Sequence, residues 1–283
     1  MNLKSQLGAA AWGFRELQTE EQLILCKKLG LIFLELGIAN APKDIPLDAT
    51  VDELKEIKEL YQKYGILLSM AATGNDFTLS SEKEVHKEVL KIKKVIEICS
   101  LLGIKYLRIF AGFSHAEEVI GTRYKIMIKA ITEVAEYARI KSVILAIETH
   151  GGVDVYEDGV VHYMSVTTDL EHLRHLIREI PRDVKFVFDA PNLYAVGIKH
   201  PEEIYSMMKD RIAYMHFKDF IKMPNGHIKP EACGESDMDW RAFLKAVSDF
   251  TGPVLIEYEN PDRIKEGCQK SIQYLINMLE ERR

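Results

Sequence analysis

The sequence predicts an α/β fold, and three observations carry this prediction. Short apolar runs of the kind that form buried strands alternate with longer stretches whose apolar residues recur at three- and four-residue steps. Eight such pairs follow one another along the 283 residues, and no long polar linker separates them. A strand followed by a crossover helix, repeated around the chain, is the pattern of a (β/α)8 TIM barrel. We therefore expect residues 1–283 to form a single barrel domain.

The expected strands are apolar runs bounded by polar residues or glycine. They cover residues 7–12, 31–36, 66–71, 106–111, 143–148, 184–189, 212–217 and 254–259. The alternative is a doubly wound open sheet, which usually has fewer strands. A nucleotide-binding sheet of that kind would carry GxGxxG after its first strand, where this chain has AAAWGF. The barrel is therefore favoured.

The expected helices are amphipathic. The third one is the clearest, because apolar residues from Val85 to Cys99 recur on one face and Gly103 supplies a C-cap. The other helical patterns cover residues 19–29, 51–64, 118–139, 168–180, 201–209, 239–249 and 261–281. Residues 153–166 are longer than a minimal connection between strand and helix, and we expect a hairpin-like insert or lid there.

Composition excludes several classes of function. The formal net charge is −6 and no basic stripe is present, which argues against a nucleic-acid partner. No apolar run approaches the roughly 18 to 20 residues that span a membrane. The four cysteines are scattered without a CxxC pair, which argues against a zinc ribbon or a disulfide scaffold. We expect a cytoplasmic protein.

Polar residues close the apolar runs, at the end of the barrel where such folds place their chemistry. These residues are Trp12, Glu35, Asn75, Arg108, Glu148, Asp189, His216 and Glu257. The last four come from four consecutive strands. Taken singly, an acid at a strand end is more often a helix cap or an ion-pair partner, and a lone histidine is more often a core residue.

Three carboxylates in one mouth repel one another. At 4 Å two like charges cost about 4 kcal/mol at an effective dielectric constant near 20. Protonation, a basic side chain or a cation can relieve this repulsion. His216 favours the cation, because three oxygen ligands and one nitrogen suit Mn²⁺, Mg²⁺ or Co²⁺, with Zn²⁺ also acceptable. We expect one divalent metal ion, with Mn²⁺ first among the candidates.

Four segments carry a family resemblance: VILAIETHGG, VFDAPNLYAVG, YMHFKDF and VLIEYE, in this order. With them the chain resembles the xylose isomerase-like TIM barrel superfamily, which includes sugar phosphate isomerases and epimerases, ketose 3-epimerases and inosose dehydratases. The resemblance implies that Glu148, Asp189, His216 and Glu257 hold one divalent metal ion. It also implies that Glu148 and Glu257 act as the acid/base pair. Asn192 stands where many relatives have a histidine, which puts a dinuclear site in doubt.

Five residues are candidates for substrate binding: Arg108, His150, Asn192, Lys218 and Glu235. Four of them have a structural alternative. Arg108 could instead neutralise Glu35, His150 could be bonded to backbone at the rim, Lys218 could form a surface ion pair, and Glu235 could cap a helix. Glu235 belongs to the stretch GESDMDW, where relatives often read G-E-G-D-x-D-W. Serine at position 236 would not easily adopt a positive φ, so the loop geometry could differ.

The expected activity is a metal-dependent isomerase or epimerase of a small ketose-type sugar, which abstracts a proton next to a metal-bound carbonyl. The main alternative is a dehydratase of a keto-inositol or related polyol, that is, a lyase. An apurinic-type endonuclease, a non-catalytic sugar-binding barrel and a metal-free hydrolase with paired carboxylates are weaker alternatives. Only Arg108 and Lys218 could serve a phosphate, so an unphosphorylated sugar or polyol is favoured. The resemblance leaves a homo-oligomer open.

Overall fold

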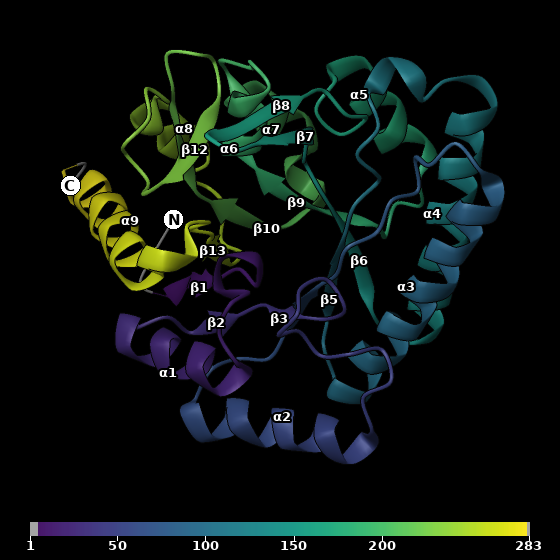
Figure 1. Cartoon of the computed structure of the whole chain (residues 1–283), viewed down its shortest axis with the longest axis horizontal. Coiled ribbons are helices and arrows are strands. Elements are labelled where there is room, and N and C mark those ends of the chain that lie inside the picture. The colour runs from purple at the N-terminus through teal and green to yellow at the C-terminus, as the bar shows by residue number, and fades with distance from the viewer. Residues whose placement is uncertain (1–4, 282–283) are drawn as a thin grey trace.

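The computed structural model describes residues 5–281. Its main sheet consists of parallel strands in the order β2-β1-β13-β10-β9-β6-β5-β4-β3 (Figure 1). The strands are β1 (Leu7–Ala9), β2 (Phe33–Leu34), β3 (Leu36–Gly37), β4 (Met70–Ala72), β5 (Tyr106–Ile109), β6 (Ile144–Glu148), β9 (Lys185–Asp189), β10 (Ile212–Phe217) and β13 (Val254–Ile256).

The sheet closes at the second predicted strand. β2 pairs with β1, while β3 pairs with β4, and only Glu35 separates β2 from β3. The two ends of the strand order are therefore consecutive pieces of one extended run. The sheet is a TIM barrel, as predicted, and the open-sheet alternative is wrong.

Helices cover the outside of the barrel (Figure 1). They are α1 (Thr19–Leu29), α2 (Val51–Tyr64), α3 (Glu82–Leu102), α4 (Gly121–Ile140), α5 (Leu170–Glu179), α6 (Ala190–Ala195), α7 (Pro201–Met208), α8 (Trp240–Ala246) and α9 (Ile264–Glu280). The predicted cap at Gly103 is confirmed: its φ is 75°, and its N–H bonds to the carbonyls of Cys99 and Ser100. α6 was not predicted, because a helix of six residues is too short to show a periodicity.

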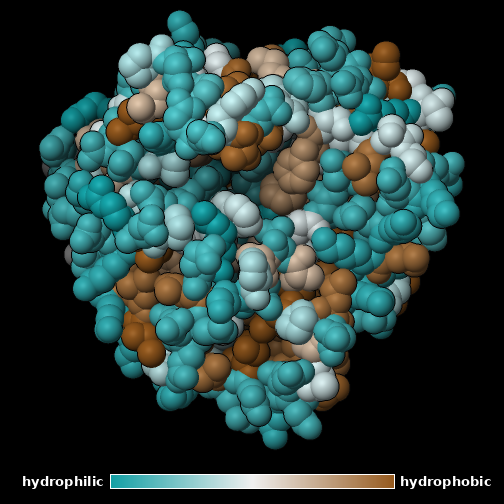
Figure 2. All heavy atoms as spheres, in the orientation of Figure 1, coloured by the Kyte–Doolittle hydropathy of each residue, from teal (hydrophilic) through white to brown (hydrophobic). Residues whose placement is uncertain are grey.

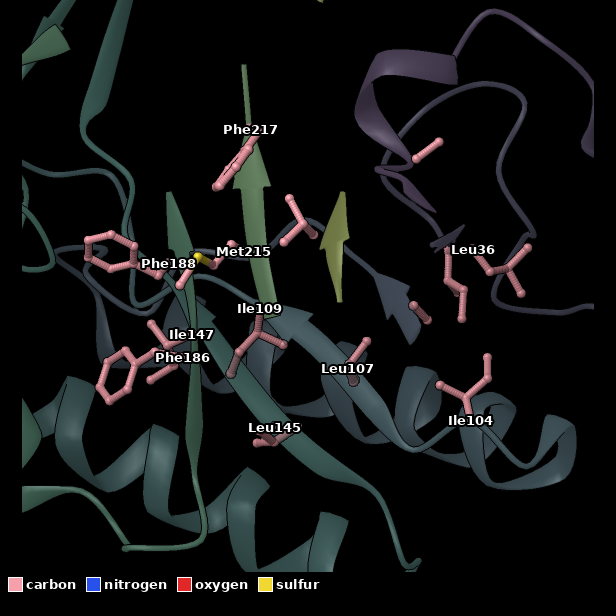
Figure 3. Packing of buried hydrophobic residues seen from close by; sticks show 14 of the residues in the cluster. Leu36, Ile104, Leu107, Ile109, Leu145, Ile147, Phe186, Phe188, Met215 and Phe217 are labelled. Atoms are coloured by element: carbon pink, nitrogen blue, oxygen red, sulfur yellow. The ribbon is translucent and has the colours of Figure 1, made fainter. Parts of the chain in front are cut away.

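Alternation along the strands separates two apolar layers. Outward residues of the strands pack between sheet and helices (Figure 3), and they include Leu107, Ile109, Leu145, Ile147, Phe186, Phe188, Met215 and Phe217. Residues on the opposite face form a smaller cluster inside the barrel, and they include Met70, Ala146, Val187, Tyr214 and Leu255. Two residues further along four of these strands, on the same inner face, are Glu148, Asp189, His216 and Glu257. The alternation that builds the core therefore also aims the predicted site residues inward.

Two hairpins form a second sheet over the carboxyl ends of the barrel strands. The first comprises β7 (Gly152–Tyr156) and β8 (Gly159–Tyr163), which confirms the insert predicted over residues 153–166. The second comprises β11 (Asp219–Lys222) and β12 (Ile228–Glu231), and it was not predicted. Pairing of Ile228 with Val160 joins the hairpins into one antiparallel sheet, in the order β11-β12-β8-β7.

Two expectations from composition can be compared with the structure. The four cysteines are free and buried, so no disulfide scaffold is present. Within residues 5–281, none of the helices combines the length and the apolar character needed to cross a membrane.

Candidate metal centre and active site

Four buried side chains converge at the carboxyl end of the barrel. The candidate ligand atoms of Glu148, Asp189, His216 and Glu257 all lie within 4.8 Å of one another. Strand register explains how they meet. His216 is level with Asp189 on the neighbouring strand, whereas Glu148 is level with Val187, two residues before Asp189. Glu148 and Glu257 are one methylene longer than an aspartate. Glu148 reaches the centre from the level before Asp189 and His216, and Glu257 reaches it from the level after them.

The imidazole of His216 lies among the carboxylates. Its Nδ1 is 3.5 Å from Glu148 Oε1, 3.9 Å from Asp189 Oδ2 and 3.6 Å from Glu257 Oε1. Atoms that share one ion at a bond length of about 2.1 Å are about 3.0 Å apart when adjacent and about 4.2 Å apart when opposite. The measured distances lie in this range.

Hydrogen bonding gives a second test of the fit. His216 Nδ1 and Asp189 Oδ2 are buried and have no hydrogen-bond partner. Buried polar atoms without a partner are costly, and a bound ion would use both of them. The donor set of three carboxylates and one imidazole suits a divalent ion such as Mn²⁺. The residues present therefore fit the predicted metal.

Arg108 meets Glu148 from the neighbouring strand. Its Nε lies 3.2 Å from Glu148 Oε2, and both side chains are about 2% exposed. Burial opposes the charge on Glu148, but the positive charges of Arg108 and His216 outweigh it and hold the pKa of Glu148 well below its usual range. Arg108 is thus a permanent partner of this carboxylate. The ion pair of Arg108 is therefore with Glu148, and the charge of Glu35 also helps to raise the pKa of Arg108 against its burial.

Lys218 lies on the other side of the cluster. Its Nζ is 2.6 Å from Glu257 Oε2, 2.8 Å from Glu259 Oε1 and 3.1 Å from Asp189 Oδ2. Asp189 Oδ2 has no hydrogen-bond partner, so its contact with Lys218 is an ion pair without the alignment of a hydrogen bond. Burial raises the pKa of Asp189 to about 7, with Lys218 opposing the shift and Glu148 and Glu257 adding to it. Lys218 is fully buried, so it is not part of a surface ion pair.

Glu35 lies beneath His216 in the barrel interior. It accepts hydrogen bonds from Tyr214 Oη at 2.6 Å and from the N–H of Ala11 at 3.1 Å. Its Oε1 is 3.7 Å from His216 Nε2, the ring nitrogen that points away from the other carboxylates. Glu35 therefore contacts the imidazole from the side opposite the candidate ion.

Asn192 lies close to the centre and donates hydrogen bonds to two of the candidate ligands. Its amide Nδ2 donates to Glu148 Oε1 and to the carbonyl of Thr149, each at 3.2 Å, and its N–H donates to Asp189 Oδ1 at 2.8 Å. Asn192 is fully buried and does not line the cavity described below. The structure thus places it against two of the candidate ligands.

The loop after β12 lies apart from the centre. Glu235 is exposed and is 4.0 Å from Lys270, and it does not line the cavity. The loop is held by Asp219, whose Oδ2 accepts from the N–H of Gly234 and from Trp240 Nε1. Position 236 is not among the residues with a positive φ, so serine is accommodated there without strain.

A cavity of about 670 Å³ opens above the charged cluster. Its lining includes His150 and the charged residues Arg15, Arg108, Glu148, Lys218, Glu257 and Glu259. Figure 2 shows a hollow near the middle of the face in view, and hydrophobic residues lie along its upper edge, where Figure 1 places β7 and β8. The aromatic side chains of Trp12 and Phe110 also line this cavity.

Glu259 and His162 also line the cavity, although neither was predicted from the sequence. Glu259 follows Glu257 by two residues and is bound to Lys218, so extending the same alternation by one step would have found it. His162 belongs to β8 and reaches the cavity only because the hairpin folds over the barrel. Burial lowers the pKa of His162 to about 3, so it is neutral at physiological pH.

Comparison with known proteins agrees with this architecture. A curated relative, "Inosose isomerase" of Bacillus velezensis, is 22% identical over 260 residues, covering 90% of this chain and 88% of the relative. The solved structure "IOLI protein with a binding zinc atom" matches with a TM-score of 0.76 and 19% identity, covering 98% of each chain. "D-tagatose 3-epimerase-like protein" matches with a TM-score of 0.73 and 15% identity, covering 97% of each chain. The family model described as "Xylose isomerase-like TIM barrel" matches residues 23–278. The chain belongs to this family.

Proposed function

We propose that the protein is a divalent-metal-dependent isomerase or epimerase of a small polyhydroxylated ketone, with Glu148 and Glu257 as its acid/base pair. One observation carries the proposal. The two carboxylates approach His216 Nδ1 from different strands, at 3.5 and 3.6 Å, and both line the cavity. A substrate carbon above the cluster would thus have a carboxylate on each side.

Glu148, Asp189, His216 and Glu257 would hold the ion. Mn²⁺ suits this donor set best, while Mg²⁺, Co²⁺ and Zn²⁺ are alternatives, and the similar IOLI protein is described with a bound zinc atom. When bound, the ion would supply Lewis-acid chemistry by polarising a carbonyl oxygen of the substrate.

The two glutamates would move the protons. One carboxylate takes the proton from the carbon next to the carbonyl, and the other, protonated, returns a proton from the opposite face. Return to the same carbon inverts that carbon. Return to the neighbouring carbon moves the carbonyl, and the hydroxyl proton then passes from the oxygen that becomes the new carbonyl to the former carbonyl oxygen. Either course leaves the first glutamate protonated and the second ionised, so the charges balance. Positioned acid/base groups contribute roughly 10²–10⁴-fold to a rate.

Arg108, His150 and Lys218 line the cavity and would contact hydroxyl groups of the substrate. Arg108 and Lys218 are already paired with carboxylates, so neither is free to bind a phosphate, and the guanidinium of Arg15, which also lines the cavity, donates to the backbone carbonyls of Trp12 and Glu259. This supports an unphosphorylated sugar or polyol. The similarity to inosose isomerases supports a cyclic keto-polyol within that class.

The test is deuterium uptake from D₂O, followed by NMR on a panel of inososes and ketoses with Mn²⁺, Co²⁺, Mg²⁺ or Zn²⁺ added. We expect the wild type to exchange the hydrogen next to the carbonyl, and Glu257→Gln to exchange at least about 100-fold more slowly. Glu59→Gln, a matched change at an exposed glutamate of α2, should exchange normally. Exchange by Glu257→Gln at the wild-type rate would refute the assigned role. Loss of water from the substrate would instead identify a dehydratase.

A further inference from the structure

The roof of the cavity is apolar. In the hairpin of β7 and β8, Val155 pairs with Val160 and Val153 pairs with His162. Residues directly opposite each other in an antiparallel pair share one face of the sheet. All four line the cavity, so this face of the hairpin is turned toward it.

The second hairpin extends the same surface. Phe220 of β11 pairs with Pro230 of β12, and both line the cavity. Phe113 also lines it, from the loop after β5. We call Val153, Val155, Val160, Phe220, Pro230 and Phe113 the apolar wall. None of these side chains can donate or accept a hydrogen bond.

The charged cluster lines the same cavity. Arg108, Glu148, Lys218, Glu257 and Glu259 contribute to the lining, together with His150, and further polar groups come from Arg15, Asn40, His162 and Tyr163. These groups can form hydrogen bonds with the carbonyl and the hydroxyls of a sugar ring. A hydroxyl placed against the apolar wall would instead lose its bonds to water without compensation. The cavity thus offers a polar part and an apolar part.

The volume of the cavity also indicates a ligand larger than a free sugar. Its volume of about 670 Å³ falls well within the range of about 300–1,000 Å³ that accommodates drug-sized ligands. A free hexose is smaller than such a ligand and would leave much of the apolar wall uncovered. Val155 is 79% exposed, so part of this wall faces solvent until a ligand covers it.

We propose that the substrate is a ring-ketone sugar that carries an apolar group of aryl size. The ketone and hydroxyls face the charged cluster, and the apolar group lies against the apolar wall. This inference rests on the proposed function for the chemistry of the sugar part, but the wall itself can be tested without turnover.

The first test is calorimetric binding of phenyl and methyl β-glucosides, which share the sugar and lack the ketone. We expect the phenyl compound to bind at least about tenfold more tightly, since even a single methylene in an apolar pocket changes discrimination by roughly 10–200-fold. Val160→Ser should remove most of this difference. Val161→Ser is the matched control, because Val161 pairs with Asp154 on the other face of the hairpin and does not line this cavity.

The second test compares turnover of the phenyl and methyl glycosides of one ring-ketone hexose, with free inosose beside them. We expect a kcat/KM ratio of about ten or more in favour of the phenyl compound. Val155→Ser should lower this ratio, and because Val155 is exposed the substitution should leave the fold intact. Equal binding and equal turnover of phenyl and methyl compounds would overturn the inference and leave the proposed function standing. Failure of every ketone to react, with phenyl still preferred in binding, would overturn the proposed function alone.

Discussion

Replacing Asp189 by asparagine should abolish stabilisation by the metal and leave the fold intact. The side chain has two functions that the substitution separates, while Lys218, which loses its ion pair with Asp189, keeps its hydrogen bonds to Glu257 and Glu259. Oδ1 accepts the N–H of Asn192 at the start of α6, and an asparagine oxygen can do the same. Oδ2 is the atom without a hydrogen-bond partner that faces His216, and an amide there is a poor ligand for a hard cation.

The size of the effect follows from binding linkage. A ligand at 100 times its dissociation constant stabilises the native state by about 2.7 kcal/mol. An unfolding entropy of about 2.1 cal/mol/K per residue gives about 0.6 kcal/mol/K for 283 residues. Mn²⁺ should therefore raise the Tm of the wild type by about 4–5 °C. If the substitution weakens binding 100-fold, the same Mn²⁺ concentration stabilises by only about 0.4 kcal/mol, and the Tm rises by less than about 1 °C.

The assay is thermal unfolding of chelator-treated protein with and without Mn²⁺, at pH 8. Burial raises the pKa of Asp189 to about 7, so protons compete with the ion below that pH, and the shift in Tm should shrink at pH 6. Asp48→Asn, at an exposed aspartate remote from the cluster, should show the wild-type shift. An unchanged Tm in the wild type, or equal shifts in the wild type and Asp189→Asn, would contradict the metal assignment.

Three further outcomes are expected. Arg108→Met leaves the buried carboxylate of Glu148 without its ion-pair partner. In the presence of chelator it should lower the free energy of unfolding by about 3–5 kcal/mol, and by less with Mn²⁺, as measured by urea unfolding. An equal loss in both conditions would argue against Arg108 and the metal acting on the same carboxylate. Burial lowers the pKa of His162 to about 3, so the unfolded chain binds a proton below about pH 6.5 that the folded chain does not. Wild-type stability should therefore fall from pH 7 to pH 4, and His162→Gln should lose less over this interval; equal losses would mean that the histidine is not titrating with unfolding. Thr50→Ala removes the cap that bonds the N–H of Glu53 and should cost about 1 kcal/mol at neutral pH, as measured by denaturant midpoints, with no effect on the metal-induced shift in Tm.

The sequence by itself determined the barrel and the four candidate ligands. Both follow from local pattern. A strand with apolar residues on both faces fixes alternate side chains toward the interior, and a polar residue two positions beyond the last inner apolar one must face the mouth. Thus Ala146 predicts the direction of Glu148, and Leu255 predicts that of Glu257. Closure of eight strands then brings such residues together.

Only the tertiary structure decided what surrounds these ligands. The pairing of Arg108 with Glu148, the position of Asn192 behind the cluster and the placement of Glu235 outside the cavity depend on contacts between segments far apart in the sequence. The same holds for His162, which the first hairpin carries over the mouth. Local periodicity fixes which way a strand residue points, but a residue in a loop or hairpin has no such constraint. Its position is set by long-range packing, which no single stretch of sequence contains.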